Sequence, residues 1–469
     1  MKSTFTDQYR DRVVQNLLPT TAFDGKFAPS ATIEERMAYY HTPGVSIAII
    51  DDYEISWTAG FGVADANSTR LVTPNTLFQV GSISKPIFTL AVMHLVQEGI
   101  VDLDADVNSY LISWRIPENE GWQPRITLRH LLSHTSGLTV QMFPGYFYTE
   151  PLPSIVQILN GAPPANTPKV EANIFPGIQF CYSGGGMVVA QQVLVDLLGK
   201  PFTEIMRELV LTPLGMHDST YEQPLPAHRA QHAATAHLWK GVPLPGKWYC
   251  YPEMAAAGLW TTASDLAKVG VELMGVLQEK KAPRLLSRHT VKAMLTPQLP
   301  DQQEGQHYFG LGFECDGKDE GFYFSHSGWT EGYITQLRFY PNLGKGAVIM
   351  INSNEGYPLH DEIIRSIAKE YQWPDVFPES KTPYALTQLD GYLGTYLTPT
   401  GLSMVVTLND THLMLQLAKQ PPIRIVPTSE LEFTIPILNA SVVFEKDNNG
   451  QIISLTLTQP GKQIKARKQ

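Results

Sequence analysis

The sequence contains little cysteine. Its three cysteines, Cys181, Cys250 and Cys315, are odd in number, widely separated, and without a CxxC pair or zinc-finger spacing. A disulfide framework and a cysteine-bound zinc ion are therefore not expected.

Runs of positive charge are also missing. The 469 residues include 35 lysines and arginines against 45 aspartates and glutamates, a formal net charge of -10. This balance provides no basic surface for nucleic acid or an anionic membrane. The basic residues from Lys462 to Lys468 form a small tail near the carboxyl terminus that we expect to be solvated.

Long apolar runs are absent as well. The segment Ile87–Val96 is apolar on nearly every side, but it is too short to span a bilayer and is predicted to be a buried helix. The amino terminus has no apolar segment of the kind that signal peptides carry. The sequence thus predicts no membrane span and a cytoplasmic location, or a periplasmic one if a signal has been removed.

The buried helix begins at an unusual stretch, Gly81-Ser82-Ile83-Ser84-Lys85-Pro86. Ser82 and Lys85 are three residues apart, so their side chains share one helical face and can touch. Free backbone N–H groups at a helix start favour a developing negative charge. A serine beside an amine in this position is a candidate nucleophile, although an N-cap serine followed by a solvated lysine would leave the same short pattern.

A second pattern places His130 and His134 four residues apart, in a short helix that Thr127 is expected to cap. This spacing suits a metal ion, but the glutamate of the His-Glu-x-x-His motif is missing, so packing or hydrogen-bonding histidines are favoured. No cofactor is expected. The Pro- and Gly-rich segment 139–176 that follows is either a wall of a substrate cleft or a packed surface loop.

The rest of the chain alternates between helical and extended patterns. Residues 45–63 form a predicted hairpin around Asp51-Asp52. The triple glycine at 184–186 is expected to allow close backbone approach and unusual dihedral angles before a helix from Met187. Further predicted helices cover 202–211 and 360–371, and Thr262 or Ser264 is expected to cap another. Predicted strands cover 308–313, 321–325, 333–340 and 346–351.

The last part of the chain changes character. Short alternating segments separated by turns begin at about Leu389, and Asn448-Asn449-Gly450 is typical of a hairpin. The sequence predicts an all-β module, a small barrel or sandwich, without a catalytic constellation.

Several of these segments resemble, in order, the serine β-lactamase-like superfamily of class C β-lactamases, D-Ala-D-Ala carboxypeptidases, D-aminopeptidases and esterases. The resemblance covers about residues 30–370. The matching segments are Ser82-Ile83-Ser84-Lys85, residues 131–138, Tyr182-Ser183-Gly184, residues 258–267, and His326-Ser327-Gly328. The opening of the β-module at 389–396 is similar to lipocalin-like barrels that follow some peptidase-like members.

The resemblance implies an α/β (α+β) fold in which an antiparallel sheet is flanked by helices and joined by a helical subdomain. It implies a hydrolase domain over 1–375, a linker over 376–388, and an all-β lipocalin-like barrel over 389–469.

The resemblance also implies roles for individual residues. Ser82 would attack a carbonyl and become acylated, while Lys85 and Tyr182 would move its proton. The backbone N–H groups of Ser82 and Trp329 would form the oxyanion hole. His326, on the segment with Ser327 and Gly328, would bind or polarise the distal part of the substrate.

Two positions differ from the common family pattern. Gly184 stands where an asparagine often contacts the lysine and the acyl group, and His326 replaces a lysine that is common in β-lactamases. These differences favour a serine esterase or D-amino-acid peptidase acting on a small-molecule ester, peptide or β-lactam. A β-lactamase, a catalytically weak penicillin- or peptide-binding protein, and an assembly protein whose β-module drives polymerisation are the alternatives; a homo-oligomer is left open.

Overall fold

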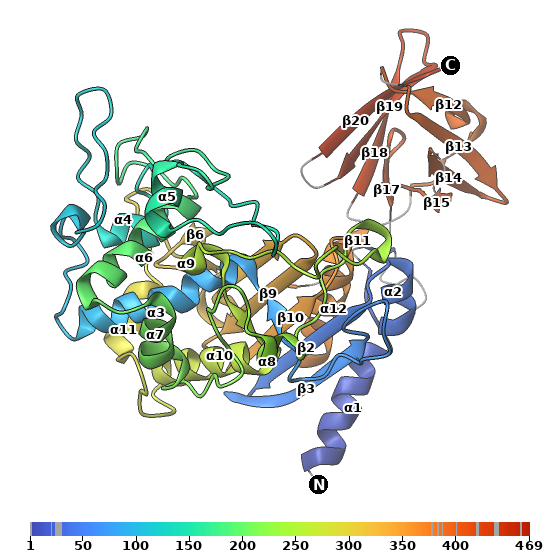
Figure 1. The fold of residues 1–469 in the computed structure, drawn as a ribbon. Coiled ribbons are helices and arrows are strands. Elements are labelled where there is room, and N and C mark those ends of the chain that lie inside the picture. The colour runs from blue at the N-terminus through green and yellow to red at the C-terminus, as the bar shows by residue number, and fades with distance from the viewer. Residues whose placement is uncertain are drawn as a thin grey trace. The chain divides into compact units, whose positions relative to one another are not determined.

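The computed structural model describes residues 2–19, 21–23, 31–376, 379–381, 384–386, 388–399, 401–418, 422–435, 440–459 and 462–469. The chain divides into two compact units (Figure 1). One contains Met37–Tyr357 with the first six residues, and the other contains Asp7–Arg36 and Pro358–Gln469. The linker expected at 376–388 is only partly described, and the domain boundaries stay predictions.

Seven described strands form the antiparallel sheet of the first unit, in the order β3-β2-β10-β9-β8-β7-β6. The strands are β2 (Gly44–Asp51), β3 (Glu54–Gly62), β6 (Tyr308–Phe309), β7 (Glu314–Asp316), β8 (Tyr323–Thr330), β9 (Tyr333–Tyr340) and β10 (Lys345–Ile351). The hairpin predicted at 45–63 is confirmed as β2–β3, in which Ile49 pairs with Trp57. Helix α10 (Ala263–Leu277) lies against β2, β3, β9 and β10, and Thr262 caps it as expected.

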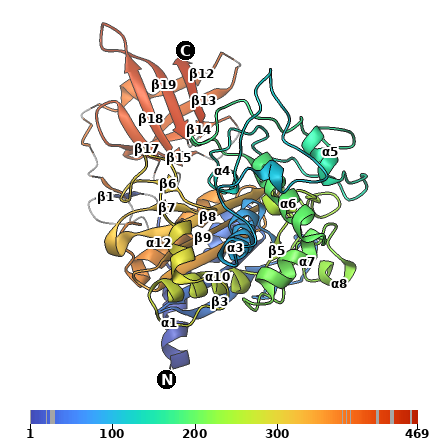
Figure 2. The same cartoon turned by 90° about the vertical axis from the view of Figure 1, so that its left-hand side faces the viewer.

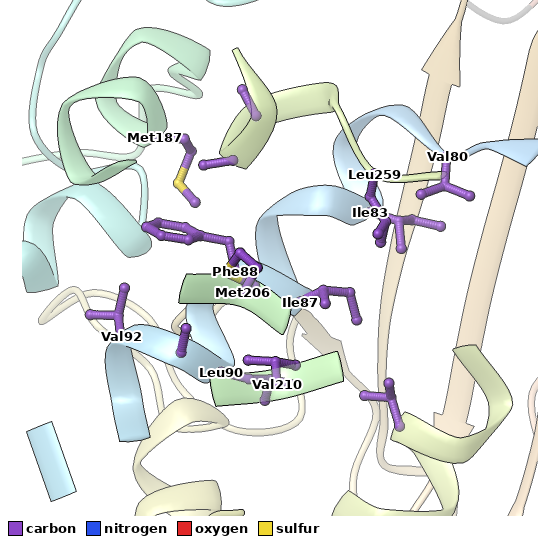
Figure 3. Close-up of a cluster of buried hydrophobic side chains, with 14 of the residues drawn as sticks. Val80, Ile83, Ile87, Phe88, Leu90, Val92, Met187, Met206, Val210 and Leu259 are labelled. Atoms are coloured by element: carbon purple, nitrogen blue, oxygen red, sulfur yellow. The ribbon is translucent and has the colours of Figure 1, made fainter. Parts of the chain in front are cut away.

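The apolar segment after Ser82 is helix α3 (Ser84–Gln97), and a 3₁₀ turn, η1 (Gly81–Ile83), precedes it. Figure 2 shows α3 with the sheet on one side and α6 and α7 on the other. Figure 3 shows apolar side chains of α3 packed with those of neighbouring helices, including Met187, Met206 and Val210. Each such buried side chain stabilises the fold by about 1.5–3 kcal/mol, so α3 is held firmly along its length.

Most helices of the helical subdomain around α3 are short, and side chains cap two of those near the site. Thr127 caps α4 and Ser154 caps α5, each by accepting a hydrogen bond from a backbone N–H in the first turn. The other elements of this unit are α4 (Leu128–Leu132), α5 (Ile155–Asn160), α6 (Gly184–Leu198), α7 (Phe202–Met206), the π-helical turn η3 (Arg207–Leu211), α8 (Ala227–Ala230), α9 (Met254–Ala257), α11 (Arg288–Met294), and the short strands β4 (Phe78–Gln79) and β5 (Trp260–Thr261).

The second unit contains a nine-stranded antiparallel sheet, as far as its residues are described. The order is β15-β14-β13-β12-β20-β19-β18-β17-β16, and the two edge strands are neighbours in sequence, so the sheet forms a nearly closed barrel. Its strands are β12 (Gly394–Leu397), β13 (Ser403–Asn409), β14 (His412–Leu417), β15 (Ile423–Arg424), β16 (Val426–Pro427), β17 (Glu432–Ile435), β18 (Ala440–Lys446), β19 (Ile452–Gln459) and β20 (Lys462–Lys468). The predicted all-β module and its hairpin at 448–450 are confirmed.

The remaining helices and strands are α1 (Lys2–Val14), α2 (Ile33–Tyr39), α12 (Tyr357–Tyr371), β1 (Thr21–Phe23) and β11 (Glu379–Lys381). Arg36 donates to Glu362 at 2.6 Å, which joins the end of α2 to α12 within the second unit. No helix among the described residues is long and apolar enough to cross a membrane.

Lys465 and Arg467 near the carboxyl terminus are exposed, as expected. They lie on the strand β20, which was not predicted; it pairs with β12 and β19, and Ala466 enters the barrel core. Two predictions about local structure were wrong. The predicted strand 308–313 ends at Phe309, since Gly312 adopts a left-handed φ of 80° before β7 begins.

The second concerns the triple glycine, which is not irregular but forms the first turn of α6. The close backbone approach expected there does occur, because a Cβ on Gly185 would lie 2.6 Å from the carbonyl oxygen of Thr139.

Candidate active site

Ser82 lies in the tight turn between β4 and α3. Gly81 before it has a φ of 49°, in the left-handed region that glycine tolerates best. A Cβ on Gly81 would lie 2.5 Å from the carbonyl oxygen of Trp329, so the backbone of β8 presses directly against this turn. Glycine is required here both by conformation and by space.

Lys85 holds the Ser82 hydroxyl from the first turn of α3. The Lys85 Nζ lies 2.9 Å from Ser82 Oγ and donates a second hydrogen bond, 2.8 Å long, to the carbonyl oxygen of Ala256 on α9. The lysine is only 3% exposed, so these contacts replace water around its amine. The predicted contact between the serine and the lysine is present.

Tyr182 joins this pair from a distant part of the chain. The Lys85 Nζ lies 5.0 Å from the centroid of the Tyr182 ring. Tyr182 stands two residues before α6, and Ser183 caps that helix by accepting a hydrogen bond from the N–H of Gly186 at 2.9 Å. The fold therefore brings together the three residues for which catalytic roles were predicted.

The segment His326-Ser327-Gly328-Trp329 lies inside β8, not after a strand as predicted. A Cβ on Gly328 would come within 1.9 Å of the carbonyl oxygen of Val80, so only glycine lets β8 approach the turn that carries Ser82. The side chain of Trp329 is 53% exposed while its backbone faces Gly81. The backbones of Ser82 and Trp329, the predicted oxyanion donors, thus lie on two segments in contact.

His326 is a buried, neutral imidazole. Its Nδ1 lies 2.6 Å from the carbonyl oxygen of Ser327, and because a carbonyl only accepts, Nδ1 carries the hydrogen. Burial and the nearby charge of Lys85 lower the pKa of His326 to about 3. The side chain therefore presents no positive charge at neutral pH, and its role toward a substrate stays a prediction.

The space beside Gly184 is occupied. A Cβ on Gly184 would lie 2.9 Å from the carbonyl oxygen of Gln141 and 2.9 Å from the Phe143 ring. The loop before α5 thus fills the position where an asparagine side chain would extend. Glycine at position 184 therefore fits this packing, and it also leaves the site without the amide side chain that an asparagine would provide.

Three exposed apolar side chains lie on segments that carry or adjoin the catalytic candidates. Met142, Phe180 and Trp329 are exposed by 66%, 44% and 53%. Met142 lies between Gln141 and Phe143, the two residues nearest a Cβ on Gly184. Phe180 lies two residues before Tyr182 and packs on the Phe309 ring with centroids 5.5 Å apart, and Trp329 follows Gly328 on β8.

Sequence reasoning missed several groups in this region. The Ala256 carbonyl carries no side-chain signal. The hydroxyl of Ser84, to which no role was given, donates to the Gly81 carbonyl at 2.6 Å and accepts from the Leu259 N–H at 3.0 Å, so it supports the turn. No group of three or more His, Cys, Asp or Glu in the described ranges is arranged to hold a metal ion.

The fold is that of β-lactamase- and penicillin-binding-protein-like serine hydrolases. The chain belongs to the Beta-lactamase family, whose profile matches residues 30–372. It is 23% identical over 429 residues to penicillin-binding protein 4* of Bacillus subtilis, covering 88% of this chain and 92% of that protein. It is 31% identical over 186 residues to the esterase EstB of Burkholderia gladioli, covering 37% of this chain and 46% of the esterase.

A solved structure shows the same fold over nearly the whole chain. The octameric penicillin-binding protein homologue from Pyrococcus abyssi superposes with a TM-score of 0.62 at 22% identity, covering 93% of this chain and 98% of that one. Because so much of this chain is covered, the likeness includes the carboxyl-terminal module.

Proposed function

We propose that the protein is a serine hydrolase that cleaves a small-molecule ester or amide, of the esterase or D-amino-acid peptidase type, through an acyl-enzyme on Ser82. The observation that carries this proposal is the 2.9 Å contact between Ser82 Oγ and Lys85 Nζ, with the Tyr182 ring beside the same amine. A hydroxyl held by an amine at a helix start is the arrangement of an activated nucleophile.

In the first half of the reaction, Ser82 Oγ attacks the substrate carbonyl and its proton passes to the Lys85–Tyr182 pair. The pair returns the proton to the leaving alcohol or amine as the bond to the acyl group breaks. Water then attacks the acyl-serine ester, and its proton travels by the same pair back to Ser82.

The negative oxygen formed in each half-reaction lies at the junction of the Ser82 turn and β8. The backbone N–H groups of Ser82 and Trp329 are the proposed donors to it. Removing one such donor costs about 3–4 kcal/mol of transition-state stabilisation in comparable enzymes. The close fit of Gly81 and Gly328 against the neighbouring backbones supports this assignment, since it keeps the two segments together.

The surroundings favour a neutral, apolar substrate over one with a carboxylate near the reacting carbonyl. His326 is uncharged at neutral pH and offers no fixed ammonium on β8. Met142, Phe180 and Trp329, which are exposed on segments that carry or adjoin site residues, can instead pack on apolar groups. Similarity to the esterase EstB is in keeping with this substrate class.

A second candidate is a β-lactamase or a catalytically weak penicillin- or peptide-binding protein on the same scaffold. The occupied space at Gly184 favours weak turnover, because no asparagine side chain is there to contact the lysine or the acyl group. The similarity to penicillin-binding protein 4* points the same way.

Steady-state hydrolysis separates the two candidates. A panel of p-nitrophenyl esters, D-amino-acid amides, D-Ala-D-Ala peptides and a chromogenic cephalosporin is compared for the wild type and Ser82→Ala. We expect ester or amide turnover that Ser82→Ala reduces at least about 1,000-fold. Equal turnover by wild type and Ser82→Ala would overturn the hydrolase proposal, and stable cephalosporin binding without turnover would favour the second candidate.

A further inference from the structure

His134 is the buried histidine that the predicted catalytic scheme does not use. It follows α4 and has a φ of 56°, a left-handed conformation that side-chain-bearing residues rarely adopt. It is only 1% exposed. A bulky residue kept in such a conformation inside the protein is held there by its surroundings, and such residues cluster at functional sites.

Three contacts connect His134 with three consecutive residues around Tyr182. The His134 carbonyl oxygen accepts a 2.7 Å hydrogen bond from the N–H of Cys181. Its ring lies over the Tyr182 ring, with centroids 4.2 Å apart and planes inclined by 36°. Its Nδ1 accepts a 3.2 Å hydrogen bond from the N–H of Ser183. One residue thus holds the tyrosine itself and the backbone on both sides of it.

The Ser183 contact also determines the protonation of the ring. An Nδ1 that accepts a hydrogen bond from a backbone N–H carries no hydrogen, so the hydrogen of the neutral ring is on Nε2. Burial, with the charge of Lys85 next and the neighbouring His326 after it, lowers the pKa of His134 well below its usual range. A neutral ring keeps the Ser183 contact and leaves Lys85 as the positive charge beside Tyr182.

The other neighbours keep the ring in place. Phe309 lies edge-on with its centroid 4.9 Å from that of His134, and Phe180 lies 6.1 Å away. The titratable groups that face His134 are Lys85 from α3, His326 from β8 and Tyr182 itself. Packing on several sides therefore prevents the imidazole from turning away from Tyr182.

We propose that His134 is a positioning residue of the catalytic centre, which holds the Tyr182 ring at Lys85 through its ring face, its Nδ1 and its carbonyl oxygen. The inference rests on the proposed function, since it requires Tyr182 to carry the proton. His134 touches neither the substrate nor Ser82 and acts through Tyr182.

The test compares variants of the full-length protein in p-nitrophenyl ester hydrolysis. His134→Phe keeps an aromatic ring and removes the Nδ1 acceptor, and we expect kcat to fall about 100-fold with KM changed less than about threefold, because a small misplacement of a catalytic group costs about this much. His134→Asn offers an amide oxygen to the Ser183 N–H and tolerates a left-handed backbone, so it is expected to recover about tenfold over His134→Phe.

His130→Phe is the matched control from the same short helix. His130 lies at the third helical position of α4, where its Nδ1 accepts a hydrogen bond from the Thr127 N–H at 3.3 Å. This variant is expected to lower the melting temperature and leave kcat within about twofold. Circular dichroism and melting curves verify that each variant is folded. If His134→Phe does not fold, His134→Asn takes its place in the kinetic comparison with the wild type.

A double-mutant cycle with Tyr182→Phe distinguishes positioning from mere packing. If His134 acts through Tyr182, then His134→Phe has little further effect on kcat once the phenol is gone. Equal losses in both backgrounds, or a wild-type kcat for a folded His134→Phe, would overturn the inference. Activity that is insensitive to Ser82→Ala would instead overturn the proposed function, so the two failures are told apart.

Discussion

The surroundings of Ser82 and the core of the carboxyl-terminal barrel bury different kinds of side chain. Around the candidate nucleophile, Lys85, His134 and His326 are each 3% exposed or less. In the described part of the barrel the core is apolar and aromatic, and its buried polar residues are hydroxyl-bearing: Thr398, Thr434 and Ser454.

This difference indicates where chemistry is expected. Burying a titratable group costs free energy unless it is well paired, whereas burying an aromatic side chain stabilises the fold. Buried titratable side chains that cluster at one place are typical of catalytic sites. The barrel core is adequately explained by stability alone.

The largest change in stability is expected from a substitution in the barrel core, and it tests whether that core contributes stability alone. Phe444 is 1% exposed and contacts the rings of Tyr392 and Phe433, each with centroids 5.1 Å from its own. Phe444→Ala is expected to destabilise the barrel by about 3–5 kcal/mol, as measured by chemical denaturation. The exposed Ile453→Ala on β19 is the control and should stay within about 0.5 kcal/mol. A large loss of kcat in folded Phe444→Ala would show that the barrel takes part in the chemistry.

An intermediate effect is expected when the family asparagine is restored by Gly184→Asn. The new side chain meets Phe143 and the Gln141 carbonyl, so we expect a loss of about 1–3 kcal/mol in unfolding free energy and no gain in cephalosporin hydrolysis. Gly391→Asn, where nothing lies within 4 Å of a Cβ, is the control for the substitution itself. A stable Gly184→Asn that hydrolyses cephalosporins would show that Gly184 alone limits β-lactam turnover.

A pH-dependent effect is expected for Glu253, whose carbonyl oxygen accepts a 3.0 Å hydrogen bond from the N–H of Ala256. Burial raises the pKa of the Glu253 carboxyl from 4.5 to about 8. The folded state therefore binds the proton more tightly than the unfolded state, and this group's contribution to stability falls as pH rises from about 4.5 to 8.

In that range the contribution of Glu253 to the unfolding free energy falls by at most about 1.4 kcal/mol per pH unit. Glu253→Gln removes it, so the stability difference between the variant and the wild type should shift in favour of the variant as pH rises from 5 to 8. Taking the difference cancels the contributions of His134 and His326, which change in the same range. Parallel pH curves for the two proteins would contradict the buried, protonated carboxyl.

Local rules predicted much of the fold. The apolar run after Ser82 predicted α3, and the alternating pattern after Leu389 predicted most of the barrel strands. Thr127 and Thr262 cap helices α4 and α10, as expected. Strand β20 was missed because its lysines dominate the segment, and only Ile464 and Ala466 form its alternating apolar face.

The arrangement of the candidate active site could not be predicted from local sequence patterns alone. Ser82, Tyr182 and His326 are joined only by tertiary structure, so family resemblance had to bring them together. The Ala256 carbonyl and the three contacts of His134 could not be predicted, because they depend on backbone positions far apart in sequence. The spacing of His130 and His134 suited a metal ion, but the missing glutamate favoured packing or hydrogen-bonding histidines, and both rings do accept hydrogen bonds from backbone N–H groups.

The most direct test of a nucleophilic Ser82 is the mass of a covalent adduct trapped on the protein, a phosphonyl group from a fluorophosphonate or an acyl group from an ester. The wild-type protein is incubated with a fluorophosphonate or rapidly quenched with a p-nitrophenyl ester, digested, and mapped by mass spectrometry. The account predicts one adduct, on the peptide that holds Ser82 and Ser84, assigned by fragmentation to Ser82 and absent from Ser82→Ala. No adduct, or an adduct that persists in Ser82→Ala, would contradict it.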